Sequence, residues 1–346
     1  MAVTHSSRSA IAQIHERARI RDLVEPELRA AVESLPSGVR RVAGYHFGWW
    51  DAAGVAQEGG SGKAVRPLLT MLAAEGVHGD VRSAVPAAVA VELVHNFSLL
   101  HDDVLDADET RRHRPTAWTV FGTDAAILAG DALLSLALDV AMSGHGAAST
   151  ACARTLSAAV QELIAGQVAD LSLERRVQVE SAESQEMAQQ KTGTLLGCAG
   201  AMGALAAGAS GERVAALRSF GVCVGMAFQH VDDLLGIWGD PQVTGKPIYA
   251  DLRRRKKSLP VVAALTSGTT PGDELARMYS QPEPLRDGQL PRAAWLVEEA
   301  GGRQWSQEQA RLLRERAVGL VEDVVPVHAA ARDLRALAVA LTSRSC

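Results

Sequence analysis

The chain has 346 residues, 47% of them apolar, with a mean hydropathy of +0.02, so it can bury a large core. Its net charge of −5 and pI of about 6.1 exclude the global basic excess that is typical of nucleic-acid-binding proteins. The four cysteines form no C-x-x-C pair, the N-terminus is polar, and no uncharged apolar run reaches roughly 18 residues. We therefore expect a cytoplasmic protein with no disulfide scaffold, signal peptide or membrane span.

Helical periodicity dominates the chain, and scarce aromatics (4%) with abundant alanine and leucine favour helix. Helices are predicted over 8–35, 66–74, 86–106, 124–143, 150–175, 183–208, 211–235, about 292–300 and 305–342, with another beginning near Leu259. Glycines mark a loop over 51–62, and residues 266–292 read as a surface loop because they are rich in Gly, Pro, Ser and Thr. No alternating strand pattern is present. The sequence thus predicts one all-α domain over 1–346.

The third of these helices ends in the string Asp102-Asp103-Val-Leu-Asp106. Asp102 and Asp106 are one turn apart and share a face, where two carboxylates can chelate cations. An apolar run precedes them, and the negative end of the helix dipole makes buried carboxylates there costly without a positive partner. A divalent cation with oxygen ligands is the simplest partner, and Mg²⁺ usually arrives with phosphate.

A second apolar helix ends in Asp232-Asp233, and this repeat is far more specific than one cluster alone. Facing helices in a bundle can hold cations between such carboxylates. A basic run follows each cluster: Arg111, Arg112 and Arg114 after the first, and 253–257 after the second. Such runs are usually solvated faces, but their positions here predict anion binding. Lys63 in G-S-G-K is no phosphate-binding P-loop, because Ala64 replaces the required Ser or Thr and no strand precedes it.

Seven motifs, in order over residues 59–262, resemble those of trans-polyprenyl diphosphate synthases of the farnesyl/geranylgeranyl type. They are GSGKAVRP, ELVHNFSLLHDDVLDADETRRHRPT, ILAGDALL, GQVADL, QKTGTLLG, FQHVDDLLGIWGDP and TGKPIYADLRRRKKSLP. The resemblance implies a large helical bundle of the isoprenoid synthase type, with a central cavity between the two aspartate-bearing helices. It also implies a homodimer.

The resemblance implies a role for each matched residue. Three Mg²⁺ ions and the allylic diphosphate would be held by Asp102, Asp103, Asp106, Asp232 and Asp233, with charge added by Arg111, Lys191, Lys246 and Lys256 or its neighbour Lys257. The diphosphate of isopentenyl diphosphate would be bound by Lys63, Arg66, His95 and Arg112. Oxygens at Lys191, Thr192 and Gln229 would face the developing carbocation. Gly236 departs from the pattern, because many relatives carry an aspartate there.

The implied reaction condenses isopentenyl diphosphate with dimethylallyl, geranyl or farnesyl diphosphate and releases diphosphate. Growth of the product along the helix before Asp102 would make Phe97, Ser98 and Val94 the determinants of its length. One aromatic and one small residue there resemble geranylgeranyl synthases, with farnesyl or longer products as the alternative. Two other readings stay open. A class I terpene cyclase would need an N-D-x-x-S-x-x-x-E string, and a non-catalytic synthase subunit tends to lose the aspartates.

Overall fold

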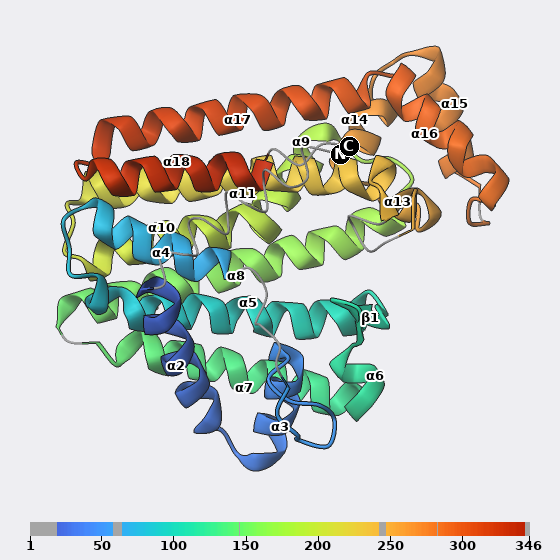
Figure 1. Ribbon diagram of the computed structural model, residues 1–346. Helices are drawn as coiled ribbons and strands as arrows, with labels where there is room; N and C mark the ends of the chain where they lie inside the picture. Colours follow the sequence, from blue (N-terminus) through green and yellow to red (C-terminus); the bar gives the residue numbers. More distant parts are fainter. Residues whose placement is uncertain (1–18, 58–63, 145, 242–246, 282, 343–346) are drawn as a thin grey trace.

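The computed structural model describes residues 19–57, 64–144, 146–241, 247–281 and 283–342 (Figure 1). The protein is all-α, as predicted. Its N-terminal half consists of α2 (Arg19–Glu33), α3 (Ser37–Phe47), α4 (Val65–Gly76), the 3₁₀ turn η1 (Val81–Ala84), α5 (Val85–Leu105), α6 (Ala117–Phe121), α7 (Thr123–Met142) and α8 (Ala147–Arg175). The remainder consists of α9 (Ser181–Ala188), the π-helical turn η2 (Gln189–Gly193), α10 (Thr194–Ala206), α11 (Gly211–Trp238), α13 (Ala250–Arg253), α14 (Leu259–Leu265), α15 (Thr270–Tyr279), η3 (Asp287–Gln289), α16 (Leu290–Glu299), α17 (Gly302–Val324) and α18 (His328–Thr342).

Long helices pack side by side around one large apolar core (Figure 1). Helix α5 lies in the middle, with α7 on one side and α4 and α10 on the other. Helix α11 packs against α10 and α17. Because α5 is buried on most of its circumference, its sequence is apolar all round rather than striped. A smaller apolar cluster lies under α14, α15 and α16, which project beyond the bundle in Figure 1.

Residues 266–292 do not form the predicted loop, because α15 occupies their centre. The Thr269 hydroxyl accepts a hydrogen bond from Gly272 N at 3.2 Å and so caps the helix, and Pro271 lies in its first turn. Leu275 and Tyr279, one turn apart, are buried in the smaller cluster. The Thr and Pro that suggested a loop are here helix-start signals.

Other predicted boundaries also differ from the structure. The helix predicted over 305–342 is divided into α17 and α18 by residues 325–327, where Pro326 cannot continue a helical hydrogen-bond ladder. The helix predicted over 183–208 contains the π turn η2. Two short strands, β1 (Thr110–Arg111) and β2 (Arg114–Pro115), pair antiparallel after α5 although no strand pattern was visible. The predicted segment 8–18 lies outside the described residues.

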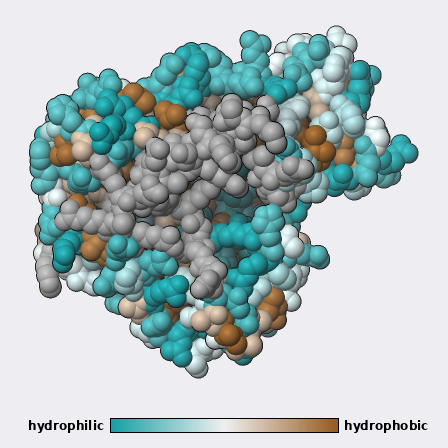
Figure 2. Space-filling view, in the orientation of Figure 1, coloured by the Kyte–Doolittle hydropathy of each residue, from teal (hydrophilic) through white to brown (hydrophobic). Residues whose placement is uncertain are grey.

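By length and composition alone, three of the described helical segments would be able to cross a membrane: Val81–Leu105, Thr123–Met142 and Gly211–Trp238. Their most apolar windows are 72%, 33% and 56% buried inside the protein, so the second is the least covered of the three. The face in Figure 2, by contrast, is mainly hydrophilic, with apolar residues in small groups.

Candidate active site

The first aspartate cluster lies at the C-terminal end of α5, where Asp106 is the capping residue. Asp103 is only 1% exposed and accepts a 2.7 Å hydrogen bond from Arg111 Nε on β1. Its second carboxyl oxygen is buried and finds no partner among the described residues. Burial raises the pKa of all three carboxyls, that of Asp102 to about 6. The cluster therefore lacks the positive charge that its ionised form needs.

The second cluster lies in the last turns of α11, with Asp232 exposed and Asp233 3% exposed. Asp233 accepts hydrogen bonds from Gln229 Nε2 at 2.7 Å and from Leu259 N at 2.9 Å. Burial still raises its pKa to about 7. These contacts fix Asp233 in the protein interior and leave the Asp232 carboxylate facing outward.

Helices α5 and α11 end at the same end of the bundle, near β1 and α13 (Figure 1). Lys191 lies beside the first cluster, with its Nζ 2.6 Å from Asp170 Oδ2. Although burial lowers the pKa of Lys191, the carboxylates of Asp170, Asp102 and Asp106 raise it overall. Lys191 therefore adds a second cation beside the first cluster, in addition to Arg111, and Asp170, for which the sequence predicts no role, holds it. Asp170 is the aspartate of the motif GQVADL, which pointed to this position.

Lys191 and Thr192 belong to the π turn η2, a local widening of the helix that often marks functional sites. The Thr192 hydroxyl donates a 2.7 Å hydrogen bond to Gln229 Oε1, and the Gln229 amide in turn holds Asp233. A continuous chain of hydrogen bonds thus joins η2 to the second cluster.

The predicted basic loop presents its two lysines differently. Lys256 Nζ lies 4.0 Å from Asp233 Oδ1. Burial lowers its pKa, but the carboxylates of Asp233 and Asp251 outweigh this and raise it. Lys257 instead donates to the main-chain oxygens of Leu173, at 2.8 Å, and Glu174, at 3.2 Å. Lys256 is thus the lysine that faces the aspartates, whereas Lys257 caps the end of α8.

A second group of cations surrounds the buried carboxylate of Glu92 on α5. Burial lowers the pKa of Arg66 to about 10, while Glu92 opposes that shift. Burial, followed by the charges of Arg66 and Arg112, holds the pKa of His95 well below its usual value. The Glu92 carboxylate accepts a hydrogen bond from Asn96 Nδ2 at 3.1 Å. Its other oxygen and Arg66 Nε have no partner within the part of the chain that the structure describes. The group has an excess of positive charge, which favours an anion. The predicted Lys63 and Lys246 lie outside the described residues.

The three predicted length determinants are all buried on α5. Phe97 meets His101 edge to face, with ring centroids 4.8 Å apart. His101 Nε2 is 3.1 Å from Ile127 O on α7, and Gly130 leaves room for its ring. Ser98 Oγ donates to His95 O within the same helix. Phe97 therefore has the bulk and the rigid support of a floor, and Ser98 adds little volume.

Within the described ranges, no three His, Cys, Asp or Glu side chains converge into a metal cage. Magnesium is usually held by one or two carboxylates together with substrate phosphates, rather than by protein ligands alone. The outward Asp232, the desolvated Asp102 and the unpartnered oxygen of Asp103 offer such carboxylates. The donor set therefore fits Mg²⁺ bound jointly with a diphosphate.

Comparison with known proteins identifies the family. The family model for polyprenyl synthetase matches residues 55–293. The chain is 43% identical over 326 residues to a (2E,6E)-farnesyl diphosphate synthase of Mycobacterium tuberculosis, covering 93% of this chain and 91% of that protein. It is 44% identical over 323 residues to a geranylgeranyl diphosphate synthase of the same organism, with the same coverage. A crystal structure of a polyprenyl synthetase from Streptomyces coelicolor superposes with a TM-score of 0.89 at 45% identity, covering 94% of this chain and 98% of that one. The chain therefore belongs to the polyprenyl synthetase family and is a chain-elongating prenyltransferase.

Proposed function

We propose that the protein is a magnesium-dependent geranylgeranyl diphosphate synthase that elongates allylic diphosphates with isopentenyl diphosphate. The observation that carries the proposal is the meeting of two aspartate-bearing helix ends around Lys191 and Lys256. A relative at 44% identity makes this product. A relative at 43% makes farnesyl diphosphate, which is the alternative.

In this proposal Asp102, Asp106 and Asp232 would hold Mg²⁺, with Asp103 and Asp233 behind them. Bound Mg²⁺ would neutralise charge on the departing diphosphate. Lys191, held by Asp170, and Lys256, beside Asp233, act on the same leaving group as fixed cations. Both ammonium groups are anchored by carboxylates, so they need no reorganisation when the carbon–oxygen bond breaks.

The second substrate would bind where Arg66, Arg112 and neutral His95 surround Glu92. Its double bond attacks the allylic carbon, a carbon–carbon bond forms, and the proton that is lost passes to the released diphosphate. Oxygens of Thr192 and Gln229, already aligned by their mutual hydrogen bond, are placed to face the cation that develops. No nucleophilic side chain is required.

We further propose a homodimer formed through the apolar residues that α7 and the neighbouring helix α8 leave exposed. Leu128 is 61% exposed and Val168 63%, with Ile127, Met142 and Ile164 also uncovered. Several large apolar side chains exposed on two neighbouring helices favour an interface there. Light scattering should give twice the chain mass for the wild type and a lower mass for Leu128→Glu.

The test of the function is a product assay with Mg²⁺, isopentenyl diphosphate and, separately, dimethylallyl, geranyl and farnesyl diphosphates. We expect a twenty-carbon product. Asp102→Asn should lower turnover by at least about 10²-fold, the scale for loss of one electrostatic group at a reacting centre. Asp323→Asn, an exposed aspartate at the far end of α17, is the matched control and should leave turnover unchanged. A wild type that elongates no starter would overturn the proposal, and a fifteen-carbon product would favour the alternative.

A further inference from the structure

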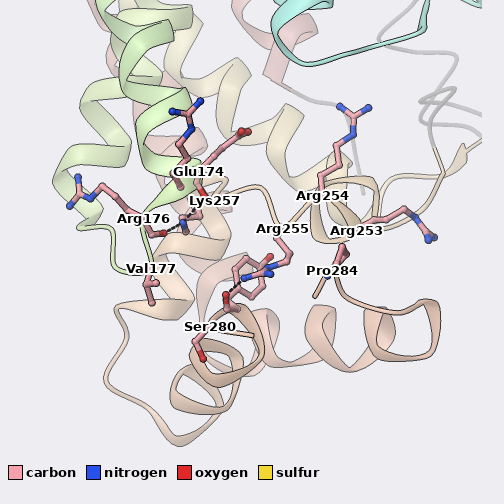
Figure 3. Close-up of a pocket in the computed structure, with 11 residues that line it drawn as sticks. Glu174, Arg176, Val177, Arg253, Arg254, Arg255, Lys257, Ser280 and Pro284 are labelled. Carbon is pink, nitrogen blue, oxygen red and sulfur yellow. Dashed lines mark hydrogen bonds between the residues drawn. The ribbon is translucent and has the colours of Figure 1, made fainter. Parts of the chain in front are cut away.

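A basic cleft of about 370 Å³ lies beside Lys257 (Figure 3). It is bordered by the end of α8, the loop 253–257 and the end of α15. Six cationic side chains and one carboxylate line it: Arg175, Arg176, Arg253, Arg254, Arg255, Lys257 and Glu174. Six cations against one carboxylate favour an anionic ligand over a neutral one.

Two of these cations are fixed by main-chain oxygens instead of carboxylates. Lys257 donates to the last carbonyls of α8, and Arg255 donates to Tyr279 O, to Gln281 O at 2.6 Å and to Glu283 O at 3.3 Å. Figure 3 shows Arg255 and Lys257 within the cleft. Carbonyl oxygens satisfy hydrogen bonds without cancelling a full charge. Burial and the charge of Arg255 lower the pKa of Lys257 in spite of Glu174, as expected where positive charge is in excess.

The outer cations are only partly neutralised. Arg176 pairs with Glu183, Arg253 with Asp287 and Arg254 with Asp108. Arg175 is exposed and, among the residues that the structure describes, has no hydrogen-bond or ion-pair partner. Glu174 and the three carboxylates that pair with these arginines offset four of the six cations. Glu180 also acts on Arg176 by its charge, and Asp106 and Asp251 act on Arg254 in the same way.

We propose that this cleft is a second anion-binding site, which takes a diphosphate group without a metal ion. The site adjoins the aspartate clusters but is separate from them, because Lys256 lies beside Asp233 whereas Lys257 is bonded to the end of α8. Arg254, which pairs with Asp108, lies on the side nearer the first cluster. Fixed guanidinium and ammonium groups bind phosphate oxygens directly. The ligand is inorganic diphosphate or the head of a prenyl diphosphate, which present the same chemistry.

Calorimetric titration with inorganic diphosphate in EDTA tests the site, because EDTA removes the Mg²⁺ through which the aspartates would hold diphosphate. Arg175→Glu should weaken one binding event by at least about tenfold, equivalent to about 1.4 kcal/mol. Arg154→Glu, an exposed arginine on the same helix, makes the same charge change away from the cleft and should leave the titration unchanged. Arg112→Gln weakens only metal-free binding at the Glu92 group, so the effects of Arg175→Glu and Arg112→Gln should add.

A wild type that binds no diphosphate in EDTA, or an Arg175→Glu titration equal to that of Arg154→Glu, would overturn the proposal. Repeating the titration with geranyl diphosphate identifies the source, since tighter binding indicates a prenyl diphosphate and equal binding the free anion. Arg175→Glu should retain elongation with Mg²⁺ within about twofold, because Arg175 touches no group of the aspartate site. The anion-binding cleft rests on the metal-free titrations, and the proposed synthase activity rests on the product assay. Either proposal can therefore be contradicted without the other.

Discussion

Gly236 and the Asp251 carboxylate share one small space beside the second aspartate pair. A Cβ atom built on Gly236 would lie 2.3 Å from Asp251 Oδ2 and 2.8 Å from Oδ1, closer than real Cβ contacts come. Asp251 belongs to α13, and its charge raises the pKa of Lys256. The second aspartate motif has Gly236 in place of a carboxylate, and Asp251 of α13 therefore supplies a carboxylate beside that position.

We predict that Gly236→Ala displaces the Asp251 carboxylate and lowers the free energy of unfolding by about 1–3 kcal/mol, the usual range for overpacking. In an Asp251→Ala background the same substitution should cost less, because the carboxylate that it meets is gone. Gly319→Ala on α17, where nothing lies within 4 Å, is the matched control and should stabilise by up to about 1 kcal/mol. Urea unfolding of the wild type, Gly236→Ala, Asp251→Ala and the double variant measures the coupling between the two positions. Additive changes in the free energy of unfolding would contradict the contact.

The aspartate pairs and the all-α fold could be predicted because their signals are local. A carboxylate pair after an apolar helix needs no knowledge of the rest of the chain, and 3.6-residue periodicity identifies each helix separately. Asp170 was within reach as well, since it occurs in a quoted motif, but nothing local indicates that its partner is Lys191 on the next long segment.

The remaining features depend on how distant segments meet. Which of Lys256 and Lys257 faces the aspartates is decided by the α8 carbonyls some 80 residues earlier in the chain. The approach of Asp251 to Gly236 depends on the return of the chain after α11. Thr269 and Pro271 led to a wrong loop prediction because the same residue types occur in loops and at helix starts. Burial of Leu275 and Tyr279 in the smaller cluster favours the helix.

Lys256 and Lys257 should separate catalysis from stability. Lys256→Met removes a cation from the aspartate site and should lower turnover by about 10²-fold with little change in unfolding. Lys257→Met removes charged hydrogen bonds to the end of α8 and should cost about 1.5–3 kcal/mol of stability. Steady-state assays and urea unfolding of both variants make the comparison. If Lys257→Met lost turnover while Lys256→Met did not, Lys256 would not be the lysine that faces the aspartates.

Phe97 should set the product length. Phe97→Ala opens space beside His101 and should lengthen the main product by one five-carbon unit, whereas Phe97→Trp should shorten it. Phe121→Ala, which removes an aromatic ring packed on Tyr45 away from the α5 floor, is the control and should keep the wild-type product. Chromatography of the dephosphorylated products gives the result, and an unchanged chain length in both Phe97 variants would exclude Phe97 as the floor.

Asp102 should make the metal-free protein less stable as the pH rises. Its folded-state pKa of about 6 lies above the ordinary 3.8, so folding favours the neutral carboxyl. Its contribution to stability is therefore complete below about pH 3.8 and is lost as the pH rises through 6. In EDTA, Asp102→Asn should accordingly be more stable than the wild type at pH 8, by at most about 2–3 kcal/mol.

The gap between Asp102→Asn and the wild type should close toward pH 4.5, where the wild-type carboxyl is again neutral. Urea unfolding at several pH values measures it, and the difference between the two proteins cancels groups that titrate in both. Adding Mg²⁺ with inorganic diphosphate at pH 8 should reverse the order, because only the carboxylate gains from a bound cation. A stability difference that is equal at pH 5 and pH 8 would mean that burial does not hold Asp102 neutral in the folded state. The cluster would then not depend on a metal ion for its charge balance.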